Sequence, residues 1–141
     1  MTYKKLKRLV NKYLPVVEDP NDHRSGFILT AEFIPRIEID TARADDTYLF
    51  AALTHEFGHY LSWKSGYKNY RKYCQAMLIS NSLKNINVLT KRQKLLVLEE
   101  ERRAWESGIR FVKRRGFKIN KDFYLIKKWG LKEYKDFLLG K

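Results

Sequence analysis

The chain has little cysteine and no long apolar run, and each shortage excludes a class of protein. Cys74 is the single cysteine among 141 residues, so the chain cannot form an internal disulfide. No segment reaches the roughly 20 consecutive apolar residues that a membrane-spanning helix needs. The N-terminal segment MTYKKLKRLVNKYLP also lacks the apolar stretch that follows the lysines of a signal peptide. We therefore expect an intracellular, cytoplasmic protein with no membrane partner.

Internal repeats, low-complexity segments and linkers are also absent from the sequence, which favours one domain over residues 1–141. A chain of this length with 44% hydrophobic residues can bury one core, and it is too short for two domains of ordinary size. The sequence carries no signal for an oligomeric state.

Acidic residues are scarce in the chain as a whole but not in every part of it. The 29 Lys+Arg against 16 Asp+Glu give a formal net charge of +13. Residues 1–60 hold 8 basic and 9 acidic residues, a net charge of −1, whereas residues 61–141 hold 21 and 7, a net charge of +14. A basic half of this kind is typical of proteins that bind nucleic acids or anionic membranes. Within residues 15–60, however, 9 acidic residues accompany 3 basic ones, which suits a bound dication.

The pattern of apolar residues predicts an α+β fold that begins with a helix and a small sheet. Apolar residues at helical spacing predict an amphipathic helix over residues 3–14 that ends at Pro15. Residues 15–19, 24–33 and 34–40 are rich in β-prone residues and separated by turn residues, so they predict an antiparallel or mixed sheet. The last of these segments contains PRIEID, whose alternation of apolar and charged residues is typical of a half-exposed edge strand.

The remainder of the chain is predicted to be mostly helical. We expect three helices, over roughly residues 47–64, 68–80 and 90–116. The segment NSLKNINV, residues 81–88, is typical of a loop. Thr90 and Gln93 have the spacing of a capping box at the start of the third helix, and Gly116 is suited to its end. One or two short helices, interrupted near Gly130, complete the chain.

The second predicted helix carries LTHEFGHYLS, which contains two of the three histidines of the chain. Residues four apart lie on one face of a helix, so His55 and His59 can aim ring nitrogens at a metal about 2 Å away. Glu56 is turned by about 100° from His55 and can stand beside the metal without binding it. There it can take a proton from a zinc-bound water. H-E-x-x-H thus predicts two Zn²⁺ ligands and a general base, and Gly58 permits close approach of a neighbouring element.

A hydrolytic zinc site needs a third protein ligand and a position for water. No histidine follows His59, which excludes sites whose third histidine lies downstream and leaves a carboxylate for this role. The cluster Glu99, Glu100 and Glu101, within KLLVLEEERRAWESG, is the only acidic cluster after the motif. These glutamates could equally form i,i+4 pairs, such as Glu99 with Arg103, on a solvated helix face.

HEFGHYLSW followed by EEERRAWESG resembles the gluzincin metallopeptidases, whose third ligand is a glutamate on a second helix. That glutamate often lies in an E-x-x-[AS] context, and the resemblance therefore implies Glu101 as the third ligand, with Glu100 as the second choice. The pattern is also similar to small metallopeptidase-like proteins of phages and mobile elements, and distantly to the ImmA/IrrE-type proteases. It implies a zincin-like fold and hydrolysis of protein or peptide substrates, with Glu56 as the base.

The chain departs from the gluzincin pattern at Trp105, four residues after Glu101, where that group commonly places an aspartate that supports the first histidine. Such support must then come from elsewhere, since its loss costs about 10- to 100-fold in metal affinity or activity. In zincins the strand before the motif helix often pairs with an extended substrate, and the resemblance gives PRIEID this role. The side chains available to stabilise an oxyanion, none with a diagnostic spacing, are His23, Tyr60, Tyr67, Tyr70 and Tyr73.

Two alternatives come from other classes of function. The runs YKNYRKY (67–73) and FVKRRGFKINK (111–121) interleave aromatic and cationic residues, as nucleic-acid binders do. The chain could thus be a basic DNA-binding or protein-interaction module with a non-catalytic zinc site, although closed structural sites favour cysteine. H-E-x-x-H also leaves open a zinc-dependent hydrolysis of bonds other than peptide bonds.

Overall fold

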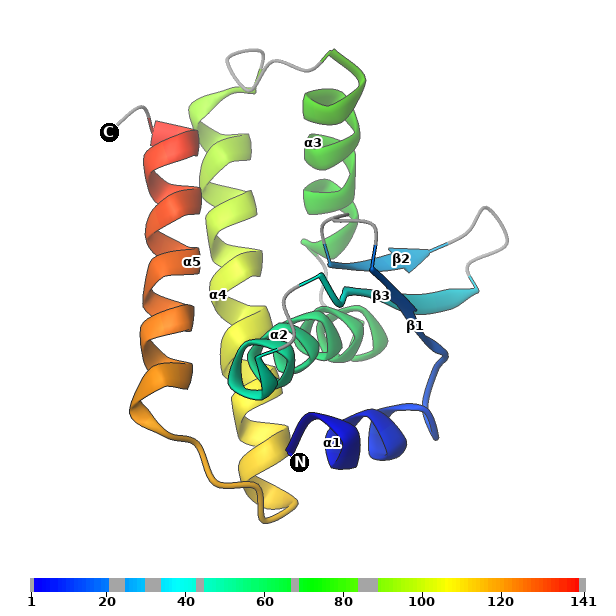
Figure 1. Ribbon diagram of the computed structural model, residues 1–141. Helices are drawn as coiled ribbons and strands as arrows, with labels where there is room; N and C mark the ends of the chain where they lie inside the picture. The colour runs from blue at the N-terminus through cyan, green and yellow to red at the C-terminus, as the bar shows by residue number, and fades with distance from the viewer. Residues whose placement is uncertain are drawn as a thin grey trace.

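The computed structural model describes residues 2–20, 25–29, 34–42, 45–66, 69–83 and 89–139. Over these residues the fold is α+β and mostly helical, with a three-stranded sheet and five helices (Figure 1). The helices are α1 (Thr2–Val10), α2 (Asp46–Lys64), α3 (Tyr70–Leu83), α4 (Lys91–Arg114) and α5 (Lys121–Leu139). The strands are β1 (Val16–Asp19), β2 (Gly26–Leu29) and β3 (Pro35–Asp40). Within the described part of the chain, no helix is both long and apolar enough to cross a membrane.

The sheet is mixed, which is one of the two arrangements that the sequence predicted. Its strand order is β1-β3-β2. β3 pairs parallel with β1 and antiparallel with β2. The prediction that PRIEID forms an edge strand is therefore wrong, because both sides of β3 are occupied. Its alternating pattern has a different cause: Ile37 and Ile39 are fully buried, and α2 packs against β3. Because β3 has no free edge, the predicted pairing of an extended substrate with this strand is excluded as well.

α1 ends at Val10, four residues before the predicted end, and residues 11–14 form turns. Leu6 and Val10 are fully buried, so the helix packs its apolar face inward as the spacing predicted. Its N-terminus is held by α2, since the Asp46 carboxylate accepts hydrogen bonds from the backbone N–H groups of Thr2 and Tyr3 at 3.2 and 3.0 Å. α1 thereby covers one side of the central helix.

α2 is the central helix, and its N-cap is Asp45, whose carboxylate accepts from the backbone N–H of Thr47 at 2.8 Å. It contacts α1, β2, β3, α4 and α5, and Figure 1 shows it running across the lower half of α4. A Cβ atom on Gly58 would lie only 1.8 Å from the carbonyl oxygen of Ala104 in α4. A Cβ on Gly108 of α4 would lie 2.1 Å from the carbonyl oxygen of Thr54. The close approach predicted for Gly58 is confirmed, and two glycines let the backbones of α2 and α4 touch.

The capping box at the start of α4 is confirmed. The Gln93 backbone N–H donates to Thr90 Oγ1 at 3.1 Å, and the Thr90 backbone N–H donates to Gln93 Oε1 at 2.8 Å. α3 extends to Leu83, so the first three residues of the predicted loop are helical, while residues 84–88 lie outside the described part of the chain.

α5 is one continuous helix through Gly130, so the predicted interruption is wrong. A glycine inside a helix costs about 1 kcal/mol relative to alanine, which packing can outweigh. Here Phe123 and Leu138 are buried on either side of the glycine, and Gly130 faces the ring of Trp105 on α4. The packing of α5 against α4 therefore holds the helix together across this position.

Candidate metal centre

The contact between α2 and α4 brings His55, His59 and Glu101 together, as the sequence predicted. His55 Nε2 lies 2.7 Å from Glu101 Oε2, and His59 Nε2 lies 3.4 Å from Glu101 Oε1. One ligand atom from each residue lies within 4.8 Å of the other two. His59 and Glu101 are buried, and His55 is only partly exposed. Two imidazole nitrogens and a carboxylate oxygen thus face a common point.

Glu100, the second choice for the third ligand, lies on the other side of His59. Its Oε2 is 2.7 Å from His59 Nδ1, and its Oε1 accepts a hydrogen bond from Ser62 Oγ at 2.7 Å. An ionised carboxylate can only accept, so Nδ1 of His59 carries the hydrogen and Nε2 is left free for a metal. Glu100 is fully buried, so its carboxylate contacts this histidine and Ser62 rather than solvent.

Glu99 alone fits the alternative of a solvated helix face. It is partly exposed and forms an ion pair with Arg102, three residues later, in place of the predicted i,i+4 partner. The three adjacent glutamates thus have three different surroundings. Glu99 faces outward, Glu100 supports a histidine, and Glu101 faces both histidines.

Aromatic rings hold the planes of both imidazoles. Trp105 stacks on His55 with ring centroids 4.5 Å apart and an interplanar angle of 14°. Tyr73, from α3, stacks on His59 at 5.7 Å and 15°, and its hydroxyl donates to Glu101 Oε1 at 3.3 Å. Position 105, where the gluzincin pattern has an aspartate, thus carries an indole that stacks on His55, and the carboxylate near Nδ1 of this histidine is that of Glu56, at 3.4 Å.

Glu56 lies beside the site, next to His55. Its Oε2 is 3.4 Å from His55 Nδ1, and the residue is buried. It is not part of the group of ligand atoms that includes Glu101. Glu56 therefore stands beside the ligand group without belonging to it, and its role as a base stays a prediction.

The charges of the cluster are strongly coupled. Burial lowers the pKa of His55, but the carboxylates of Glu56 and Glu101 outweigh it and raise that pKa to about 9. Burial also lowers the pKa of His59. The carboxylates of Glu101, Glu100 and Glu56 outweigh this effect and raise that pKa well above its usual value. Burial raises the pKa of Glu101, yet the two histidines hold it well below the usual range. The carboxylates thus attract positive charge to this point, as protons or as a metal.

The donor set fits a metal, since two histidines and one carboxylate are a known ligand set for catalytic Zn²⁺. Imidazole and carboxylate ligands also suit other first-row divalent metals, so the set by itself does not select zinc. Burial of Glu101 at 1% exposure would be costly for an unpaired carboxylate, and the two histidines and Tyr73 account for it.

Of the proposed oxyanion donors, Tyr73 has its hydroxyl at the site. Tyr60 packs against Phe57 and Phe27, and Tyr70 is buried next to Tyr73. His23 and Tyr67 lie outside the described residues. The sequence alone did not distinguish Tyr73 from the other tyrosines, because its helix carries no fixed spacing relative to the histidine motif.

No protein-family model matches this chain, and neither a curated protein nor a solved structure matches it. The site is therefore interpreted from its own geometry.

Proposed function

We propose that this chain is a zinc-dependent metallopeptidase with a zincin-like arrangement, in which His55, His59 and Glu101 hold Zn²⁺. The observation that carries the proposal is the convergence of these three side chains. Their ligand atoms lie within 4.8 Å of one another although they come from two helices, and Glu101 follows His55 by 46 residues in the sequence. Three protein ligands with a remaining open position are the arrangement of a catalytic zinc site.

The surrounding residues support this interpretation because each restrains a ligand. Glu100 accepts the hydrogen of His59 Nδ1, which leaves Nε2 for the metal. Trp105 fixes the plane of His55, and Tyr73 holds one oxygen of Glu101. Outer partners of this kind orient metal ligands and raise their basicity.

Zinc, when bound, would act as a Lewis acid that polarises a carbonyl oxygen and makes water acidic near neutral pH. The residue that would move the proton is Glu56. Its carboxylate would accept a proton from the attacking water and deliver it to the leaving amine of a protein or peptide substrate. Burial beside His55 keeps this carboxylate within the site rather than in solvent.

The decisive experiment compares Glu56→Gln with a control at a partly exposed glutamate away from the metal ligands, Glu99→Gln. Cleavage of a peptide library by the zinc-loaded protein would be followed by mass spectrometry, with zinc content measured for each variant. We expect Glu56→Gln to lose cleavage by at least about 10²-fold while it retains its zinc, and Glu99→Gln to behave as the wild type. Equal cleavage by Glu56→Gln and the wild type would refute the role of Glu56.

The competing interpretation, a basic DNA-binding or protein-interaction module with non-catalytic zinc, rests on the +14 charge of residues 61–141. Several aromatic rings of its two basic runs pack inward. Phe111 contacts Phe57 with centroids 4.7 Å apart, Phe117 stacks on Phe50 at 5.7 Å, and Tyr70 is buried. These rings do not offer a surface on which bases could stack. We therefore favour a peptidase that acts in the cytoplasm. Salt-dependent binding of DNA, without cleavage of any peptide, would favour the DNA-binding module instead.

A further inference from the structure

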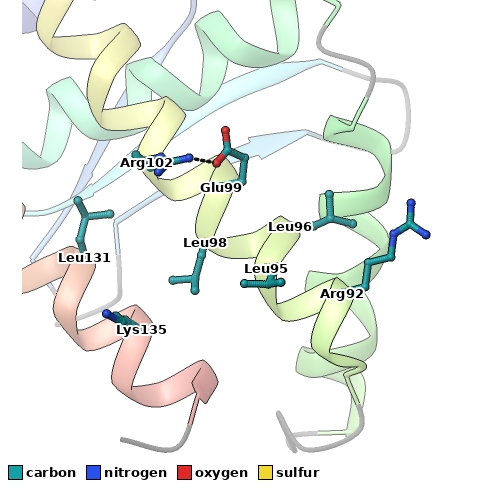
Figure 2. A pocket seen from close by; sticks show the side chains of 8 residues that line it. All are labelled: Arg92, Leu95, Leu96, Leu98, Glu99, Arg102, Leu131 and Lys135. Carbon is teal, nitrogen blue, oxygen red and sulfur yellow. Dashed lines mark hydrogen bonds and ion pairs between the residues drawn. The ribbon is translucent and has the colours of Figure 1, made fainter.

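A groove of about 570 Å³ lies between α4 and α5, on residues that the metal centre does not use (Figure 2). Leu95 and Leu98 of α4 and Leu131 of α5 supply apolar surface along it. Leu95 is 50% exposed, so part of this leucine surface is open to solvent. The volume of the groove is within the range of about 300–1,000 Å³ that is typical of ligand sites.

Cationic side chains border the leucines. Arg92 and Arg102 of α4 and Lys135 of α5 line the same groove, and the single carboxylate among its lining residues, Glu99, is already paired with Arg102. Among the described residues, Arg92 and Lys135 form no ion pair. The groove therefore presents apolar surface together with two cations that lack a partner carboxylate.

We propose that this groove docks an acidic amphipathic helix of a partner protein. Such a helix lays apolar residues at i, i+3, i+4 and i+7 into a groove, and here the three leucines provide their surface. Its acidic residues would meet Arg92 and Lys135, the two cations without a partner carboxylate among the described residues, so the occupant and the rim have opposite charge. The two helices that form the groove are antiparallel neighbours joined over residues 115–120, so the site is built on rigid elements.

The same surface fits other occupants less well. No aromatic side chain is among the described residues that line the groove, whereas grooves for single-stranded nucleic acid stack bases on aromatic rings. A second copy of this chain would bring a net charge of +13 towards a cationic rim. A flat anionic membrane would not fill a concave site. This inference does not depend on the metal centre or on peptidase activity.

The test is fluorescence anisotropy with the full chain and a labelled acidic helical peptide that carries leucines at i, i+3, i+4 and i+7. A scrambled peptide of the same composition, single-stranded DNA and phosphatidylserine vesicles are the competing probes. Leu95→Asp and Arg92→Glu are the groove variants. Their matched controls are Leu125→Asp, at an apolar position on α5 that is 42% exposed, and Arg110→Glu, at an exposed arginine of α4; neither lines the groove.

We expect the amphipathic peptide to bind, and each groove variant to weaken binding by at least about tenfold while each control stays within about twofold. Circular dichroism spectra and unfolding curves would establish that the variants are folded. Absence of peptide binding, equal binding of the scrambled peptide, or equal loss in the controls would overturn the proposal. So would preferential binding of DNA or vesicles, or self-association that Leu95→Asp abolishes, since each assigns the surface to a different occupant.

Discussion

Replacing Gly58 by alanine would test whether the backbone contact between α2 and α4 holds the metal ligands in register. The new Cβ would lie 1.8 Å from the carbonyl oxygen of Ala104 and 2.6 Å from its carbonyl carbon. The first distance is roughly 1.5 Å shorter than a van der Waals contact allows. Because the opposing atoms belong to the backbone of α4, no side-chain rotation can relieve the overlap. The two helices must therefore move apart.

Overpacking of a core typically costs about 1–3 kcal/mol, and we take the upper end because backbone atoms collide. Alanine offsets about 1 kcal/mol of this through its higher helix propensity. We therefore expect the free energy of unfolding of the metal-free protein to fall by about 2 kcal/mol, or roughly 7 °C in Tm. Metal–ligand distances tolerate only about 0.2 Å, so the separation of Glu101 from the histidines should also lower zinc affinity by at least about tenfold.

Gly130→Ala is the matched control, because the same substitution there should have the opposite sign. A Cβ at position 130 would lie 3.7 Å from Trp105 Cζ2, an ordinary contact, in the interior of α5. This variant should gain about 0.5–1 kcal/mol of stability. Denaturant unfolding with a chelator present gives the stabilities, and competition with a chromophoric chelator gives zinc affinity. A Gly58→Ala protein with wild-type stability and wild-type zinc affinity would refute the reasoning.

Three further predictions concern the residues around the metal. Glu100→Gln should weaken zinc binding by about 10- to 100-fold and Glu101→Gln by more, because the first supports a ligand and the second removes one; equal effects in a zinc competition titration would contradict this ordering. Tyr73→Phe should lower zinc affinity by about fivefold through loss of its hydrogen bond, whereas Tyr60→Phe should leave it unchanged in the same titration. Since the pKa of His55 is raised to about 9 in the metal-free protein, its contribution to stability is complete below about pH 6.5 and is lost as pH rises through 9. Zinc needs the neutral imidazole, so the Tm difference between zinc-loaded and chelated protein should grow from pH 6 to pH 9; a difference that shrinks would be inconsistent with imidazole ligands.

Signals that act within one helix could be recognised from the sequence. The capping residues Thr90 and Gln93 predicted where α4 begins, and the spacing of His55 and His59 placed them on one face of their helix. Gly58 inside the motif helix indicated a close neighbour, and α4 is that neighbour. These predictions succeeded because propensity, capping and helical period are set by residues a few positions apart.

The contacts that the sequence did not predict depend on elements distant along the chain. An alternating strand buries one face in the same way at the centre or at the edge of a sheet, so PRIEID gave no indication that β1 and β2 flank it. Gly130 predicts a break because a glycine is unfavourable in a helix. Packing of α5 on α4 outweighs that local preference. Residues at positions 99 to 101 share a helix but point in different directions, and only the crossing angle of α2 and α4 decides which one faces the histidines.

The most direct measurement is a crystal structure of the protein grown with Zn²⁺, with data collected on either side of the zinc absorption edge. The proposal predicts one anomalous peak about 2.0–2.2 Å from His55 Nε2, from His59 Nε2 and from a carboxylate oxygen of Glu101. Glu100 should remain hydrogen bonded to His59 Nδ1 in that structure. No peak between the histidines at saturating zinc, or a peak whose carboxylate ligand is not Glu101, would contradict the proposed centre.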